Sequence, residues 1–206
     1  FRLEMPDLDA PAVYQQLDPS GMIERIADFP RQCGMAWHGA VNLPLPPDFS
    51  MVDKVVILGM GGSAIGGDVV RSMALRAGKA AVVVQRDYRL PHWVDERTLV
   101  IASSYSGNTE ETISAFAEAL ESPAKKLVIT TGGRLQEIAA EHGVPTLVFH
   151  YQAEPRAAFG YSFFSLLAFL KCMGHIDIGS GDVDESIMAL KEASADAGRE
   201  VPCDRN

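Results

Sequence analysis

Short apolar runs alternate with helical stretches from Lys54 onward, and this alternation constrains the fold more than any other feature of the chain. The runs are nearly uninterrupted Val, Ile and Leu, which is typical of strands that helices cover on both faces. They lie at 55–58, 81–84, 98–102, 127–130 and 146–149. Strands that alternate with helices indicate an α/β fold, with a doubly wound parallel sheet of about five strands.

Helices are predicted after four of these runs, at 64–76, 109–120, 135–142 and 157–171. Each of these stretches follows a turn and carries apolar residues at helical spacing. Ligands of doubly wound sheets bind beyond the carboxyl ends of the strands, in the loops that open the helices. The loops after the first and third strands are therefore the places where we expect a site.

The residues on either side of the sheet differ from it in pattern. Residues 22–37 have apolar residues at helical intervals, with a bend or interruption expected at Pro30, and 43–48 are predicted as an extended linker. We therefore divide the chain into an N-terminal helical extension with its linker (1–50), an α/β domain (51–176) and a helical or extended tail (177–206).

The loop after the first strand, Gly-Met-Gly-Gly-Ser-Ala-Ile-Gly-Gly-Asp at 59–68, is rich in glycine. Gly61 and Gly62 let the main chain approach a ligand closely, and the loop opens a helix whose free N–H groups suit a phosphate. The hydroxyl of Ser63 could add a donor. Two other interpretations stay open: the glycines allow tight packing of strand and helix, or they form a dinucleotide-binding fingerprint.

The dinucleotide interpretation is disfavoured by the second strand. It requires an acidic residue at the end of that strand to hold a ribose, and the chain has Gln85-Arg86 there, with Asp87 one position late. Arg86 would suit a 2′-phosphate, so this interpretation predicts measurable affinity for NADP or NAD.

The loop after the third strand carries three hydroxyls around a glycine at the start of a helix. These are Ser104, Ser106 and Thr109. Such a loop offers backbone N–H groups and hydroxyl donors to a compact anion. We also expect Asn108 to cap the helix with Glu111 completing a capping box, which would leave the serines unexplained.

A third candidate segment is Glu154-Pro155-Arg156, between the fifth strand and the long apolar helix. Arg156 lies where a helix starts, and cations are unfavourable at that end of the helix dipole. We therefore expect Arg156 to have a partner, either Glu154 in a surface ion pair or an oxygen of a ligand.

Charge and composition exclude several classes of function. The 206 residues carry 18 Lys and Arg against 27 Asp and Glu, a formal charge of −9. Net repulsion and the lack of a basic run argue against nucleic acid or an anionic membrane as a partner. The apolar stretch 157–170 is too short to span a bilayer.

Cysteine and histidine usage indicates neither a disulfide scaffold nor a metal site. The three cysteines and five histidines have no ligand spacing, and the odd number of cysteines favours a reducing cytoplasm. The sequence therefore predicts a cytoplasmic protein without a metal site.

Three motifs together resemble the bifunctional phosphoglucose/phosphomannose isomerase family of the sugar isomerase (SIS) domain superfamily. They are the glycine-rich 59–68, Ser-Tyr-Ser-Gly-Asn-Thr-Glu-Glu-Thr at 104–112, and Glu-Pro-Arg-Ala-Ala-Phe-Gly-Tyr-Ser at 154–162. The resemblance implies a flavodoxin-like, five-stranded SIS domain that binds a hexose 6-phosphate. It also implies that isomerisation of glucose or mannose 6-phosphate to fructose 6-phosphate proceeds through a cis-enediolate, without a cofactor.

The resemblance assigns roles to particular residues. Ser104, Ser106 and Thr109 would hold the phosphate, and Gly61, Gly62 and Ser63 would contact the sugar. Arg156 would stabilise the enediolate as the catalytic cation.

The resemblance also implies a second SIS domain that supplies the catalytic Glu and the ring-opening His. We therefore expect this chain to be the amino-terminal, phosphosugar-binding half of such an isomerase, without a base of its own, and to form a homodimer. Glu111 is expected to act as a cap, and Glu154 is a fallback base. The alternative is a non-catalytic SIS domain that senses a phosphosugar and regulates a partner.

Overall fold

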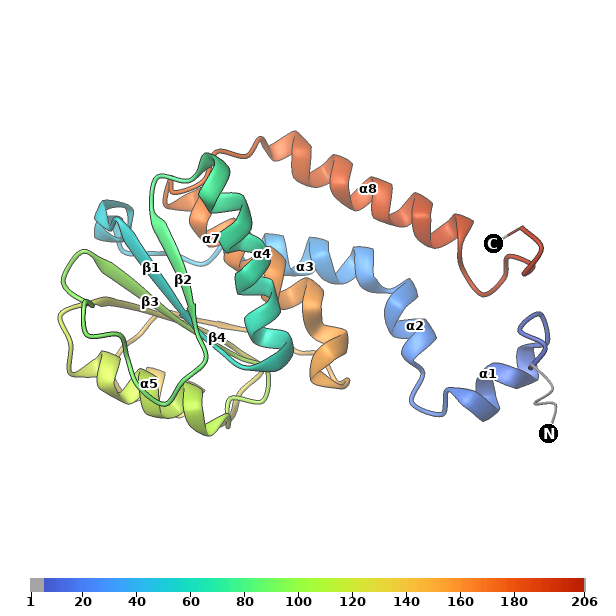
Figure 1. Cartoon of the computed structure of the whole chain (residues 1–206), viewed down its shortest axis with the longest axis horizontal. Coiled ribbons are helices and arrows are strands. Elements are labelled where there is room, and N and C mark those ends of the chain that lie inside the picture. Colours follow the sequence, from blue (N-terminus) through green and yellow to red (C-terminus); the bar gives the residue numbers. More distant parts are fainter. Residues whose placement is uncertain (1–5, 206) are drawn as a thin grey trace. The chain divides into compact units, whose positions relative to one another are not determined.

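The computed structural model describes residues 6–205. The chain divides into two compact units. The α/β unit runs from Gln32 to Ile178, and the helical unit combines the residues up to Arg31 with those from Gly179 onward. In Figure 1 the colours follow the sequence, so that the helical unit takes the blue start and the red end of the chain and the α/β unit the colours between them.

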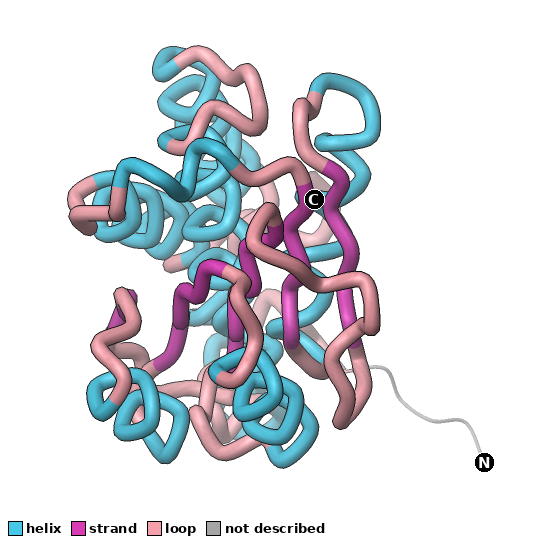
Figure 2. The backbone as a smooth tube through the Cα atoms, turned by 90° about the vertical axis from the view of Figure 1, so that its left-hand side faces the viewer, coloured by secondary structure: helices cyan, strands magenta, loops and turns pink. Residues whose placement is uncertain are grey.

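The α/β unit contains a five-stranded sheet in the order β2-β1-β3-β4-β5. Every neighbouring pair is parallel, with Leu58 of β1 beside Ala102 of β3 and Ser104 of β3 beside Thr130 of β4. The strands appear in magenta in Figure 2. Their bounds are Lys54–Leu58, Ala81–Gln85, Thr98–Ser104, Lys125–Thr130 and Thr146–Val148, from β1 to β5. The predicted doubly wound parallel sheet is confirmed.

Helices cover both faces of this sheet, which explains the apolar runs. On one face, Val56, Leu58 and Val100 pack with Phe116 of α5 (Glu110–Leu120) and with α6 (Gly133–Glu141). On the other face lie α4 (Gly61–Ala77) and α7 (Phe159–Cys172), which are extensively packed together. Figure 1 shows α5 across the sheet from α4 and α7. β3 is buried at every position.

Two glycines of α4 allow this close packing. A Cβ on Gly66 would lie 2.7 Å from Ser162 Oγ in α7, and one on Gly67 would lie 3.2 Å from Ile57 Cγ2 in the sheet. Part of the glycine-rich motif is therefore explained by packing, as one of the open interpretations held. The helix also begins at Gly61 rather than at the predicted Ala64.

The segments before the sheet differ in detail from the prediction. The helix expected over 22–37 is interrupted at Asp28, giving α2 (Met22–Ala27) and α3 (Phe29–Val41), with Pro30 in the first turn of α3. A first-turn proline lacks only an N–H that has no helical partner anyway. The predicted extended linker leads into a 3₁₀ turn, Pro47–Met51, which buries Phe49.

The helical unit contains α1 (Pro11–Leu17), α2 and α8 (Ser180–Asp196). Polar contacts tie its two segments together: the guanidinium of Arg199 pairs with Glu24, and the N–H of Cys203 donates to Asp9 Oδ1 at 2.8 Å. Within residues 6–205 no helix has the length and apolar character needed to cross a membrane.

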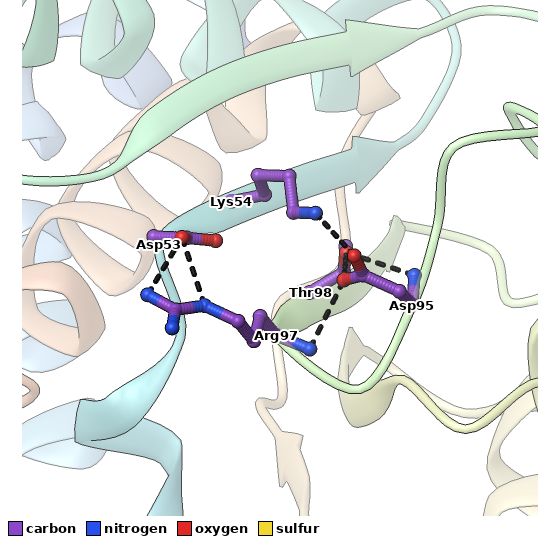
Figure 3. A network of polar contacts seen from close by, with 5 residues as sticks. All are labelled: Asp53, Lys54, Asp95, Arg97 and Thr98. Atoms are coloured by element: carbon purple, nitrogen blue, oxygen red, sulfur yellow. Dashed lines mark hydrogen bonds and ion pairs between the residues drawn. The ribbon is translucent and has the colours of Figure 1, made fainter.

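Paired charges join the amino ends of the strands β1 and β3, a region that we call the amino edge of the sheet (Figure 3). Lys54 Nζ lies 2.5 Å from Asp95 Oδ2, and Arg97 Nε lies 2.9 Å from Asp53 Oδ2. Asp95 also accepts from the hydroxyl of Thr98 at 3.0 Å. The hydrogen bond from Lys54 is the main reason why the pKa of Asp95 is lowered. This network joins the starts of β1 and β3 at the edge opposite the predicted site.

Candidate functional site

The hydroxyl loop, residues 104–109, joins β3 to α5 and is organised by its own side chains. Ser104 Oγ lies 3.0 Å from Thr109 Oγ1 and accepts the N–H of Gly107 at 3.1 Å. Ser106 Oγ accepts the N–H of Asn108 at 3.2 Å. Ser104 is buried and Ser106 is exposed. The structure thus brings the three predicted hydroxyls into one short loop, at the start of a helix whose first N–H groups lack helical partners.

The expected capping box at α5 is wrong. Thr109 is the N-cap residue, and no side chain caps this helix. The amide of Asn108 instead links two loops, because its Oδ1 accepts the N–H of Arg134 at 3.0 Å while its Nδ2 donates to Ser106 O at 3.2 Å. Asn108 therefore satisfies a free donor at the start of α6, and Glu111 is not held as a cap.

Gly107 lets the loops after β3 and β4 touch. Gly107 has a φ of +66°, and a Cβ there would lie 1.8 Å from the carbonyl oxygen of Gly132. The carbonyl of Gly107 accepts the N–H of Leu135 at 2.9 Å. Sequence reasoning did not include the loop after β4 in the site, although Thr131-Gly132-Gly133 at a strand end was a signal for it.

The start of α4 meets the segment after β5. Gly61 has a φ of +50°, and a Cβ on Gly62 would lie 3.1 Å from the carbonyl oxygen of Pro155. Ser63 Oγ accepts the N–H of Tyr105 at 3.2 Å, so the predicted sugar-contacting turn is joined to the hydroxyl loop. The three motifs of the sequence therefore converge at the carboxyl edge of the sheet.

Arg156 lies in the 3₁₀ turn Pro155–Ala158, which leads directly into α7. Its side chain is exposed, and among the ion pairs within residues 6–205 none involves Arg156. Glu154 Oε2 is buried and has no hydrogen-bond partner in that part of the chain. The expected alternative of a Glu154–Arg156 surface pair is therefore not formed.

Acidic side chains stand beside the hydroxyl loop. Glu110 and Glu111 occupy the first turn of α5, where their negative charges interact favourably with the positive end of the helix dipole. The negative charge of Glu111 is the main cause of a raised pKa of Tyr88, with smaller contributions from burial and from Glu110. An anion bound here meets these charges, so it must be held by close hydrogen bonds.

A small cavity behind these loops has a volume of about 10 Å³. Gly62, Ser63, Tyr105, Pro155 and Ser162 are among the residues that line it. This volume suits about one water molecule at most. A ligand larger than a water molecule therefore does not fit in this cavity.

The structure also bears on the other ligand classes considered. The cation that would suit a 2′-phosphate, Arg86, forms an ion pair with Asp68 of α4. Within residues 6–205 no group of three or more His, Cys, Asp and Glu side chains could hold a metal ion.

Curated proteins resemble the chain along most of its length. A bifunctional phosphoglucose/phosphomannose isomerase of Caldicellulosiruptor bescii is 42% identical over 185 residues, which are 90% of this chain and 55% of that protein. One from Thermoplasma volcanium is 39% identical over 145 residues, 70% of this chain and 43% of that protein. A D-glucosamine-6-phosphate 4-epimerase of Sulfolobus acidocaldarius is 37% identical over 125 residues, 60% of this chain and 39% of that protein. The chain spans about half the length of the curated relatives it matches.

Solved structures share the fold. A candidate phosphosugar isomerase from Silicibacter pomeroyi aligns with a TM-score of 0.66 at 16% identity, over 84% of this chain and 56% of that one. A hypothetical protein from Thermus thermophilus aligns with a TM-score of 0.64 at 21% identity, over 92% of this chain and 47% of that one. No protein-family profile matches the chain. The identity to curated relatives nevertheless confirms the resemblance, and the chain belongs to the bifunctional phosphoglucose/phosphomannose isomerase family.

Proposed function

We propose that the protein is an aldose–ketose isomerase that interconverts glucose 6-phosphate or mannose 6-phosphate with fructose 6-phosphate. One observation carries the proposal: a preorganised hydroxyl loop and an exposed arginine without an ion-pair partner in residues 6–205 lie in adjoining loops at one edge of the sheet. The names of the curated relatives support the same reaction.

The reaction moves a proton between C2 and C1 of the sugar through a cis-enediolate. It needs a base, a cation near the developing oxyanion, and a firm hold on the remote phosphate. In our proposal Ser104, Ser106 and Thr109 hold the phosphate, together with the first N–H groups of α5. Fixing the phosphate orients the reacting carbons and supplies part of the rate enhancement.

The remaining residues contact the reacting end of the substrate. We assign Gly61, Gly62 and Ser63 to the sugar, because Gly61 and Gly62 open α4 without side chains and Ser63 adds a hydroxyl. The N–H of Ser63 itself donates to Met60 O at 3.1 Å. Ser63 keeps its hydroxyl proton for the sugar while its oxygen accepts from Tyr105. Arg156 stabilises the enediolate, since its exposed charge has no carboxylate partner in the described chain.

The base is proposed to come from a second SIS domain of the full gene product, as is the histidine that opens the sugar ring. The chain spans about half of its curated relatives, which leaves room in those proteins for such a domain. Neither Glu111 nor Glu154 is assigned as the base. Assembly of two such chains into a homodimer belongs to the same proposal.

Two other functions would use the same phosphate-binding loop. A non-catalytic phosphosugar sensor would need the hydroxyl loop and would have no enediolate for Arg156 to stabilise. A sugar-phosphate epimerase is favoured by one relative, the glucosamine-6-phosphate 4-epimerase. Assays of the full gene product with glucose 6-phosphate, mannose 6-phosphate and glucosamine 6-phosphate distinguish the three functions.

The phosphate-binding role is tested by the double variant Ser104→Ala/Ser106→Ala. Each hydroxyl that donates to a charged group contributes roughly 1.5–3 kcal/mol, so fructose 6-phosphate affinity measured by calorimetry should fall at least tenfold. The control is Ser50→Ala/Ser72→Ala, which removes two exposed hydroxyls that donate to nearby carbonyls away from the site. Equal affinity of both double variants would place the phosphate elsewhere.

A further inference from the structure

Tyr105 lies between Ser104 and Ser106 in the hydroxyl loop and contacts three other loops. Its N–H donates to Ser63 Oγ at the start of α4. Its carbonyl accepts from Thr131, after β4, at 3.1 Å from the N–H and 2.7 Å from the hydroxyl. Its phenol reaches the segment after β5, so each polar group of this residue binds a different part of the site.

The phenol holds the backbone of the segment that carries Arg156. Its oxygen lies 2.6 Å from Tyr151 O and 2.8 Å from Ala153 O, and it accepts the N–H of Ala153 at 3.0 Å. A phenol has one proton, which the two carbonyls share. Ala153 lies three positions before Arg156.

Aromatic packing fixes the direction of the phenol. The ring of Tyr105 lies 6.3 Å from that of Phe149, which stacks on Tyr161 at 4.4 Å. Tyr161 belongs to α7, and Phe149 follows β5 directly. The ring is therefore held by rigid elements, and its hydroxyl is not free to leave the segment it binds.

We propose that Tyr105 is a positioning residue that sets Arg156 relative to the phosphate-binding hydroxyls. This inference rests on the proposed function, because it assumes that Arg156 acts on the substrate. The side chain of Arg156 has no ion-pair partner in the described chain, so its place depends on its backbone. Tyr105 ties that backbone to the loop that carries Ser104 and Ser106.

The inference predicts that phosphate binding and enediolate stabilisation respond differently to loss of the phenol hydroxyl. The variant Tyr105→Phe keeps the ring and the backbone contacts. In the full gene product, we expect kcat for fructose 6-phosphate to fall about 10–100-fold while KM changes less than about threefold, because small misplacements of a catalytic group cost up to about 10²-fold. Tyr161→Phe, from the same aromatic cluster, is the matched control and should behave as the wild type.

Two inhibitors separate the two effects. The affinity for inorganic phosphate reports on binding by the hydroxyl loop alone. The affinity for 5-phosphoarabinonate, whose carboxylate imitates the enediolate, also reports on the contact with Arg156. Tyr105→Phe should weaken binding of 5-phosphoarabinonate about tenfold or more and leave binding of phosphate unchanged. In an Arg156→Gln background the same change should have little further effect, because the two residues act as one unit.

Each other outcome overturns a defined part of the account. Equal losses for both inhibitors, or a full additional loss in the Arg156→Gln background, would overturn the positioning role alone. A wild-type protein that binds neither inhibitor would overturn the proposed function, and the positioning role with it. If Tyr105→Phe does not fold, Thr131→Val removes the hydroxyl that anchors the carbonyl of Tyr105 and should give the same selective pattern.

Discussion

The two edges of the parallel sheet handle polar groups in opposite ways. At the amino edge, Lys54 and Arg97 pair with Asp95 and Asp53 in a closed network (Figure 3). At the carboxyl edge lie the hydroxyl loop, glycine backbones and the turn that carries Arg156, which has no ion-pair partner in residues 6–205. Charges that neutralise one another fix a structure, whereas oriented donors and an unpaired cation suit an anionic ligand.

The comparison extends to the way in which the loops are joined. The amino edge is held by contacts between charged side chains on the surface, which contribute little individually. The carboxyl edge is held by close backbone approaches and by Tyr105 and Asn108, each of which bridges separate loops. A site that must keep its geometry without a ligand requires this kind of preorganisation.

The largest expected effect comes from removing the charge of Arg156. In the full gene product, Arg156→Gln should lower kcat for fructose 6-phosphate about 10²–10³-fold, because it removes a donor to the enediolate. Affinity for inorganic phosphate should stay within about threefold of wild type, since the hydroxyl loop is intact. Steady-state kinetics and phosphate inhibition measure both effects, and an unchanged kcat would remove Arg156 from the chemistry.

A backbone variant at the carboxyl edge should have the next largest effect. Gly107→Ala places a Cβ 1.8 Å from Gly132 O at a φ of +66°, so it combines overlap with strain. We expect the free energy of unfolding in urea to fall by about 3 kcal/mol. Gly61→Ala is the control, because its φ is +50° with no atom within 4 Å of the added carbon. It should cost about 1–2 kcal/mol, and equal losses would contradict the close approach of the two loops.

These positions illustrate what the sequence could predict. The strands could be predicted because an apolar run that is buried on both faces is visible in the local sequence alone. The three hydroxyls could be grouped because they lie within six residues of one another. The strand β3 extends to Ser104, two residues past the predicted end. The prediction ended too early because serines that follow an apolar run resemble the start of a turn. The roles of Asn108 and Tyr105 depend on loops distant in the sequence, which no local pattern contains.

A smaller effect, on the free energy of unfolding at low pH, is expected from His175 on the amino side of the sheet. His175 is 4% exposed, its ring Nε2 lies 3.2 Å from Phe49 O, and burial is the main cause of its lowered pKa. The folded state therefore binds fewer protons than the unfolded state, so this contribution to stability is complete above the unfolded pKa, near 6.5, and declines as the pH falls through the lower folded pKa.

Urea unfolding near neutral pH and at about pH 5.5 tests this difference. The wild type should lose more stability between the two conditions than His175→Gln, which has no ring to protonate. An identical loss in both proteins would show that the titration of His175 does not contribute.

The smallest effect is expected from the amino-edge counterpart of the Arg156 variant. Arg97→Gln breaks the exposed pair with Asp53 and should lower the free energy of unfolding by less than about 1 kcal/mol. The kcat for fructose 6-phosphate and the affinity for phosphate should equal those of the wild type. A loss of turnover comparable to that of Arg156→Gln would mean that the two edges do not differ in function.

A crystal structure of the protein with fructose 6-phosphate tests the central claim most directly. The account predicts the phosphate group within hydrogen-bonding distance of the hydroxyls of Ser104, Ser106 and Thr109, and the sugar carbons on the side of Arg156. A phosphate bound at any other place, with the hydroxyl loop unoccupied, would contradict it.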